Sequence, residues 1–106
     1  MSDEDGDAKV VDALRREGSD LSKPHEIDFF FDFSTEAAAR KLCEVLALDG
    51  FTDNFEVNEQ GTEFTCRAVK SLVPELNAMQ ALTRRLSALA TQHGGVYDGW
   101  GTEVVD

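Results

Sequence analysis

Hydrophobic and polar residues alternate most clearly in residues 25–33, HEIDFFFDF. Hydrophobic side chains occupy every second position of this segment: Ile27, Phe29, Phe31 and Phe33. The positions between them are mostly acidic: Glu26, Asp28 and Asp32. A period of two predicts a strand with one face buried and the other exposed. Phe30 is the exception, because it is an aromatic residue on the polar face.

Spacing typical of helices predicts three further segments, each followed by glycine. The first covers residues 7–18, the second starts at a capping Ser34 or Thr35, and the third has Pro74 in its first turn. Glycines end these helices, in order at Gly18, Gly50 and Gly94. Three more strands are expected at 51–58, 62–71 and 96–105, the first two joined as a hairpin at 59–61.

The order of these elements predicts an α+β fold of the ferredoxin-like type. It consists of a βαββαβ two-layer sandwich with an antiparallel sheet, preceded by a short N-terminal helix. Right-handed crossovers place the two later helices on one face of the sheet, with its first and third strands in the centre. We expect one domain over residues 7–106, with the introductory helix at 7–18 and a flexible acidic lead at 1–6.

The charge balance is strongly acidic, with 21 acidic and 10 basic residues and a formal net charge of -11. Nucleic-acid binding depends on lysine and arginine, so we expect no direct nucleic-acid partner. A basic protein segment would be attracted instead, although the charge could equally serve only solubility. No apolar run is long enough to cross a membrane, and the start MSDEDGDAK does not resemble a secretory signal, so a cytoplasmic location is expected.

Candidate catalytic or metal-binding groups are few. Cys43 and Cys66 lack CxxC spacing, and we expect buried reduced thiols and not a disulfide or a metal site. His25 and His93 have no neighbouring ligand at metal-binding spacing. The sequence therefore predicts no catalytic residue, no metal and no cofactor, and favours a protein that is not an enzyme.

The polar face of the first strand is the first candidate binding surface. It carries Glu26, Asp28 and Asp32 around Phe30, an arrangement suited to contact with a protein. The alternative is structural: the introductory helix folds over this face and covers Phe30 with hydrophobic residues, namely Val10, Val11 and Leu14.

The second candidate is the motif YDGWG: Tyr97, Asp98, Gly99, Trp100 and Gly101. Glycine within a strand indicates a bulge, a bend or the close approach of another chain. We expect Trp100 in the core beside Val96 and Val104, with Gly99 and Gly101 making room for neighbouring side chains to pack. Tyr97 and Asp98 could then face outward to a partner, and an exposed edge strand leaves either a monomer or a dimer open.

The motif YDGWGT at residues 97–102, together with the opening strand after DLSKPHEIDFFF, resembles the regulator of ribonuclease activity B family. These are small acidic bacterial proteins named for inhibiting the endoribonuclease RNase E. The resemblance implies a ferredoxin-like regulator that binds a protein, such as a ribonuclease with a basic segment. A small-ligand-binding or enzymatic domain on the same fold is the alternative, because one fold hosts many functions.

Overall fold

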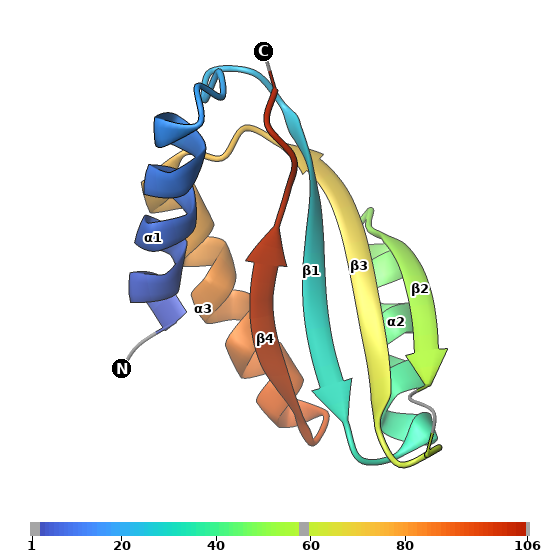
Figure 1. The fold of residues 1–106 in the computed structure, drawn as a ribbon. Helices are drawn as coiled ribbons and strands as arrows, with labels where there is room; N and C mark the ends of the chain where they lie inside the picture. The colour runs from blue at the N-terminus through green and yellow to red at the C-terminus, as the bar shows by residue number, and fades with distance from the viewer. Residues whose placement is uncertain (1–2, 58–59, 106) are drawn as a thin grey trace.

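The computed structural model describes residues 3–57 and 60–105 and forms an α+β domain with one sheet (Figure 1). Its elements, in chain order, are α1 (Asp3–Arg16), β1 (His25–Phe33), α2 (Glu36–Leu48), β2 (Thr52–Val57), β3 (Phe64–Leu72), α3 (Leu76–Gln92) and β4 (Gly95–Gly101). This is the predicted order of helices and strands. None of the helices in the described ranges is long and apolar enough to cross a membrane.

The four strands form an antiparallel sheet in the order β2-β3-β1-β4. Strands β1 and β3 are therefore central, as predicted, and β2 and β4 lie at the edges. Figure 1 shows α2 and α3 together behind the sheet, while no helix lies across the face turned to the viewer. The sheet thus has an inner face that builds the core and a second face that we call the open face.

The core lies between the inner face and the helices. Strand β1 contributes its alternate hydrophobic residues, all at most 3% exposed: Ile27, Phe29, Phe31 and Phe33. They pack with buried residues of α2 and α3: Leu42, Leu46, Met79 and Leu86. Phe29 also meets Phe51 edge to face, with ring centroids 5.6 Å apart. Burying each such side chain stabilises a fold by about 1.5–3 kcal/mol. Since β1 buries four of them, it contributes strongly to the core.

Most element boundaries differ from the prediction by one or more residues, and three of the differences matter here. Helix α1 begins at Asp3, so residues 3–6 form its first turn and do not precede it. Helix α3 begins after Pro74, because the Glu75 side chain accepts hydrogen bonds from the backbone N–H groups of Asn77 and Ala78 and so caps the helix. Strand β4 ends at Gly101 and not at Val105. Residue 58, the predicted end of strand β2, and residue 59, the first of the predicted hairpin turn, lie outside the described residues.

The segment after β4 is held by the loop that follows α1. The Asp20 backbone N–H donates to the Val105 carbonyl over 2.6 Å, and the Val105 N–H donates to the Ser19 hydroxyl oxygen over 2.9 Å. The Ser19 Oγ also lies 2.7 Å from Nε2 of His25, a fully buried ring whose Nδ1 is 2.8 Å from the Lys23 carbonyl oxygen. His25 is therefore a structural residue whose two nitrogens both have partners.

Helix α1 packs against α3 and β4 and does not fold over the open face (Figure 1). Its apolar residues Val11 and Leu14 are each 4% exposed and belong to the core cluster. The hypothesis that α1 covers Phe30 is therefore wrong. The narrow apolar stripe of α1 is buried beside α3, at the edge of the sheet.

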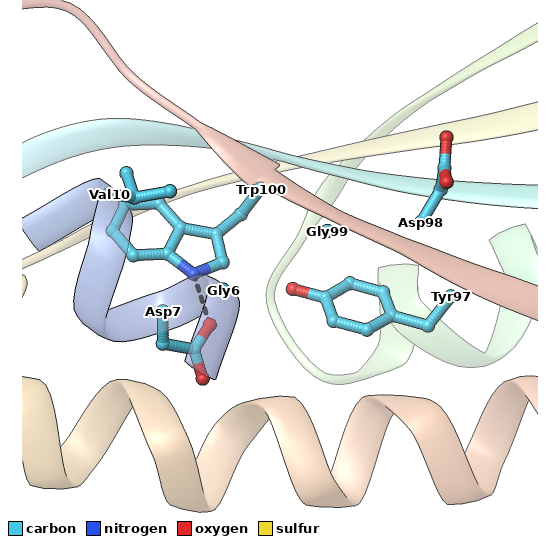
Figure 2. Close-up of a pocket in the computed structure, with 7 residues that line it drawn as sticks. All are labelled: Gly6, Asp7, Val10, Tyr97, Asp98, Gly99 and Trp100. Atoms are coloured by element: carbon cyan, nitrogen blue, oxygen red, sulfur yellow. Dashed lines mark hydrogen bonds between the residues drawn. The ribbon is translucent and has the colours of Figure 1, made fainter. Parts of the chain in front are cut away.

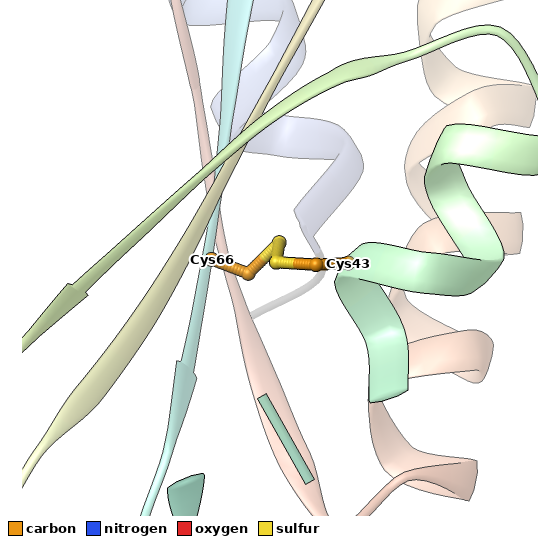
Figure 3. The surroundings of a disulfide bond; sticks show 2 residues. All are labelled: Cys43 and Cys66. Carbon is orange, nitrogen blue, oxygen red and sulfur yellow. A yellow bond between two sulfur atoms is a disulfide. The ribbon is translucent and has the colours of Figure 1, made fainter. Parts of the chain in front are cut away.

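The expectation of reduced thiols is also wrong, since a disulfide joins Cys43 of α2 to Cys66 of β3 (Figure 3). Helix α2 crosses behind β3 and brings the two Cα atoms to 6.1 Å, within the range that a disulfide can span. The cysteines are 23 positions apart in the sequence, and this spacing gave no hint of the approach. It depends on how the helix lies on the sheet.

We predict that breaking this disulfide lowers the free energy of unfolding by about 3 kcal/mol, because a loop of this length then regains its entropy in the unfolded chain. Urea unfolding of the protein with and without reductant measures the change. The double variant Cys43→Ala/Cys66→Ala is the control, and its unfolding curve should not respond to reductant. Two titratable thiols in the untreated protein, with no response to reductant, would contradict the prediction.

Candidate binding surface

The open face is formed by outward side chains of all four strands. Its described members are Glu26, Asp28, Phe30 and Asp32 of β1, Thr52 and Glu56 of β2, Thr65, Arg67, Val69 and Ser71 of β3, and Val96 and Asp98 of β4. The structure thus brings together five of the six residues predicted to bind a partner. It adds Glu56, which the sequence analysis did not single out.

Acidic groups dominate the open face. Its described charged residues are five acids and one base, Arg67. Nε of Arg67 lies 3.9 Å from the Asp28 carboxylate, and Arg67 is also the cross-strand neighbour of Phe30. On its other side Phe30 faces Gly99 of β4. Phe30 is thus a partly exposed apolar centre within an acidic surface.

Two carboxylates, Asp32 and Asp98, lie next to each other on this face. The Thr65 hydroxyl donates a hydrogen bond to Asp32 over 2.9 Å. Loss of hydration and then the neighbouring Asp32 carboxylate, both by its charge and by its hydrogen bond, raise the pKa of Asp98 above its usual value. Asp98 therefore holds its proton more tightly than an isolated aspartate does.

A β-bulge in β4 determines which residues of the YDGWG motif face outward. Phe30 pairs with Gly99 but Phe31 pairs with Tyr97, so Asp98 is the extra residue. Gly99 has a φ of 104°, a conformation that favours glycine. Of the three alternatives that the glycines left open, the structure shows a bulge. The expected packing role of the glycines is wrong, because a Cβ at Gly99 or Gly101 would meet nothing within 4 Å.

Tyr97 lies on the inner side, contrary to the expectation that it faces a partner. It is 6% exposed, and its ring centroid is 5.2 Å from that of Phe31. Figure 2 shows Tyr97 and Asp98 on opposite sides of β4. Of these two residues, only Asp98 belongs to the open face.

Trp100 is buried, as expected, but its neighbours differ from the prediction. Val96 is 63% exposed and Val104 is 39% exposed, so neither provides the expected core contact. Instead the indole N–H donates a 2.6 Å hydrogen bond to the carboxylate of Asp7 in α1 (Figure 2). The Thr83 hydroxyl of α3 donates to the same carboxylate oxygen over 2.8 Å. Asp7, only 2% exposed, therefore links α1, α3 and β4.

A pocket of about 310 Å³ lies between α1 and β4, and we call it the α1–β4 pocket. Its lining residues are Gly6, Asp7, Val10, Tyr97, Asp98, Gly99 and Trp100 (Figure 2). The sequence analysis anticipated neither the pocket nor the role of Asp7. The only signal in the sequence was that Asp7 is an acidic residue in the helix that carries the apolar stripe. Acidic residues are common throughout this chain, so this one could not be distinguished from the others.

The described residues offer no obvious catalytic centre. Within residues 3–57 and 60–105, no three His, Cys, Asp or Glu side chains gather in a way that could hold a metal ion. The hydrogen-bonded pair Ser19 and His25 resembles a nucleophile and its base, but both residues are buried and hold the C-terminal segment.

The fold and the surface define a class of protein: a small α+β domain that presents an acidic sheet face and has a pocket beside it. Within that class, the family described as Regulator of ribonuclease activity B matches residues 4–102, from α1 to the end of β4. The chain belongs to this family. The resemblance carried by YDGWGT is therefore confirmed.

Two relatives support this assignment. A Regulator of ribonuclease activity B from Pseudoalteromonas atlantica is 32% identical over 109 residues, which cover 92% of this chain and 87% of the relative. A protein of the same name from Actinobacillus succinogenes is 31% identical over 110 residues, covering 92% of this chain and 72% of the relative.

The raised pKa of Asp98 predicts a pH-dependent effect on stability. A raised pKa means that the folded protein holds this proton more tightly than the unfolded chain, so the contribution to stability is present below pH 3.8 and is lost as the pH rises through the folded pKa. Asp98→Asn should therefore raise the free energy of unfolding at neutral pH, and the gain should vanish below pH 3.8. Urea unfolding across this range measures it.

The control for this experiment is Glu103→Gln, which removes one exposed acid outside the open face. It corrects for the general benefit of lowering a net charge of -11. Identical pH profiles for the two variants would show that the proximity of Asp32 and Asp98 has no energetic effect.

We predict that Asp7→Ala lowers the free energy of unfolding by about 3 kcal/mol, because the indole N–H of Trp100 and the Thr83 hydroxyl lose their buried acceptor. Urea unfolding monitored by tryptophan fluorescence gives the value. Asp12→Ala is the matched control, since Asp12 lies on the same helix in an exposed ion pair with Arg16 and should cost less than about 1 kcal/mol. Equal losses for the two variants would contradict the linking role of Asp7.

Proposed function

We propose that this protein is a non-enzymatic regulator of a ribonuclease, and that its open face binds a basic segment of that enzyme. The family and both relatives are described as regulators of ribonuclease activity, which supports the class of target. The observation that carries the binding mode is the open face itself. No described helix covers it, and five of its six described charged residues are acidic.

The proposed mechanism is competition with RNA. RNA-processing enzymes bind RNA through basic and often disordered segments, whose positive charges neutralise phosphates. A carboxylate-rich surface offers the same segments an alternative partner and attracts them over long distances. Phe30 adds an apolar contact within the acidic surround. RNase E, the target implied by the family resemblance, is the candidate enzyme.

We further assign the architecture to the ferredoxin-like type and the place of action to the cytoplasm. The βαββαβ order after α1, with β1 and β3 central, supports the first assignment. The proposed target supports the second, because it acts on cellular RNA. The Cys43–Cys66 disulfide stands against a cytoplasmic location, since cytosolic thiols are usually kept reduced.

We propose that the protein acts as a monomer and without a cofactor. The support for a monomer is that α1 packs against β4, one of the two edge strands, and is held there by Asp7. A protein that occupies a basic segment has no chemical step for which a cofactor would be needed.

One observation favours a different function, the binding of a small ligand. The α1–β4 pocket has a volume of about 310 Å³, at the lower end of the range of small-molecule sites. The pocket lies between the introductory helix α1 and strand β4 of the sheet, a position suited to a small-ligand site. Stabilisation by a small molecule in a thermal shift experiment, without any protein partner, would favour this alternative.

The double variant Asp28→Asn/Asp32→Asn tests the proposed binding surface. We expect it to bind the ribonuclease about tenfold more weakly than the parent protein, and to show a smaller dependence on salt, because two central carboxylates are lost. Pull-down and titration at low and high salt measure both effects.

The matched control for this variant is Glu36→Gln/Glu44→Gln on α2. It removes the same amount of charge from exposed positions behind the sheet. If the two double variants bind equally well, the open face is not the binding surface. If the parent protein binds no ribonuclease at any salt concentration, the proposed function itself fails.

A further inference from the structure

We propose that the α1–β4 pocket receives an arginine side chain from the basic segment of the partner. This inference rests on the proposed function and adds a specific contact to it. The open face attracts positive charge in general, whereas the pocket would bind one side chain in a fixed position.

The chemistry of the lining fits a guanidinium group. The pocket has two carboxylates, Asp7 and Asp98, and two aromatic rings, Tyr97 and Trp100, and none of its described lining residues is basic. A cation is attracted by the face of an aromatic ring as well as by carboxylates. Arginine suits both, since its planar group stacks on rings and offers several N–H donors to carboxylate oxygens. Figure 2 shows the Tyr97 hydroxyl directed toward Asp7 and Trp100.

One glycine of the pocket lining, Gly6, has neither a packing reason nor a backbone reason in the fold. Gly6 lies inside α1, where glycine costs about 1 kcal/mol relative to alanine, yet a Cβ at this position would meet nothing within 4 Å. Its φ is not positive, unlike that of Gly99. Because Gly6 lines the pocket, a side chain at this position would narrow it. The fold does not require glycine at position 6. A ligand group that enters the pocket would require it, because a side chain there would take up the same space.

The pocket is continuous with the open face through Asp98. This residue lines the pocket and also lies next to Asp32, whose carboxylate raises its pKa. A basic segment that lies on the open face can therefore extend over the β4 edge and place one side chain in the pocket. The raised pKa of Asp98 indicates that a positive charge at this junction would be favourable.

Trp100 makes the test direct, because it is the only tryptophan of the chain and lines the pocket. The probe is a short peptide of alternating arginine and serine, titrated into the protein while tryptophan fluorescence is recorded. We expect saturable binding with a change in fluorescence. The same peptide with citrulline, a neutral isostere of arginine, should bind about tenfold more weakly or worse.

Gly6→Leu fills the pocket with a good helix former. It should abolish the fluorescence response and weaken peptide binding about tenfold, while urea unfolding shows a stability at least equal to that of the parent. The matched control is Ala13→Leu, which adds the same side chain to an exposed position of α1 and should leave binding unchanged. Should Gly6→Leu not fold, Val10→Phe fills the pocket from the next turn of the helix.

The outcomes separate the pocket from the proposed function. If the peptide binds the parent and Gly6→Leu equally, without a fluorescence change, the pocket proposal is overturned and the open face is retained. If free arginine or spermidine gives the same fluorescence change at the same concentration as the peptide, the pocket is a small-cation site and the proposal is also overturned. If the pocket binds the peptide but no ribonuclease is captured, the pocket proposal is supported and the proposed ribonuclease target is contradicted.

Discussion

The carboxylate of Asp7 determines how this domain is arranged outside its core. It is almost fully buried, and it accepts hydrogen bonds from Trp100 of β4 and Thr83 of α3. Burying a carboxylate costs free energy unless hydrogen-bond donors replace its lost hydration. Trp100 and Thr83 can supply these donors to Asp7 only when α1 lies beside β4 and α3. Helix α1 is therefore kept away from the open face. The uncovered acidic surface and the α1–β4 pocket both follow from this one placement.

In the proposed binding mode, electrostatic repulsion on the open face would be a source of binding free energy. The carboxylates of Asp32 and Asp98 lie next to each other, and only Arg67 supplies a positive charge among the described residues of this face. The pairing of β1 with β4 sets the backbone positions of these two residues. A basic segment that binds there would remove the repulsion in addition to forming new contacts.

The sequence alone was sufficient for features that depend on local periodicity. The alternation in β1 predicted both its buried side and its acidic side, and the order of elements predicted the central strands. Tyr97 was misplaced because the bulge at Asp98 breaks the alternation, so that Tyr97 and Trp100 face the same side although three positions apart. The Asp7–Trp100 bond joins residues 93 positions apart, and no local pattern reports such a contact.

Attraction and selectivity require different features, and the bulge in β4 provides for both. An acidic face attracts every basic segment, so charge alone cannot distinguish one partner from another. Selectivity requires a site with shape, and the proposed arginine pocket has one. The positive φ of Gly99 permits the bulge, which turns Asp98 toward the open face and brings Tyr97 and Trp100 together on the inner side. A single backbone feature thus joins the surface that would attract a partner to the pocket that would select it.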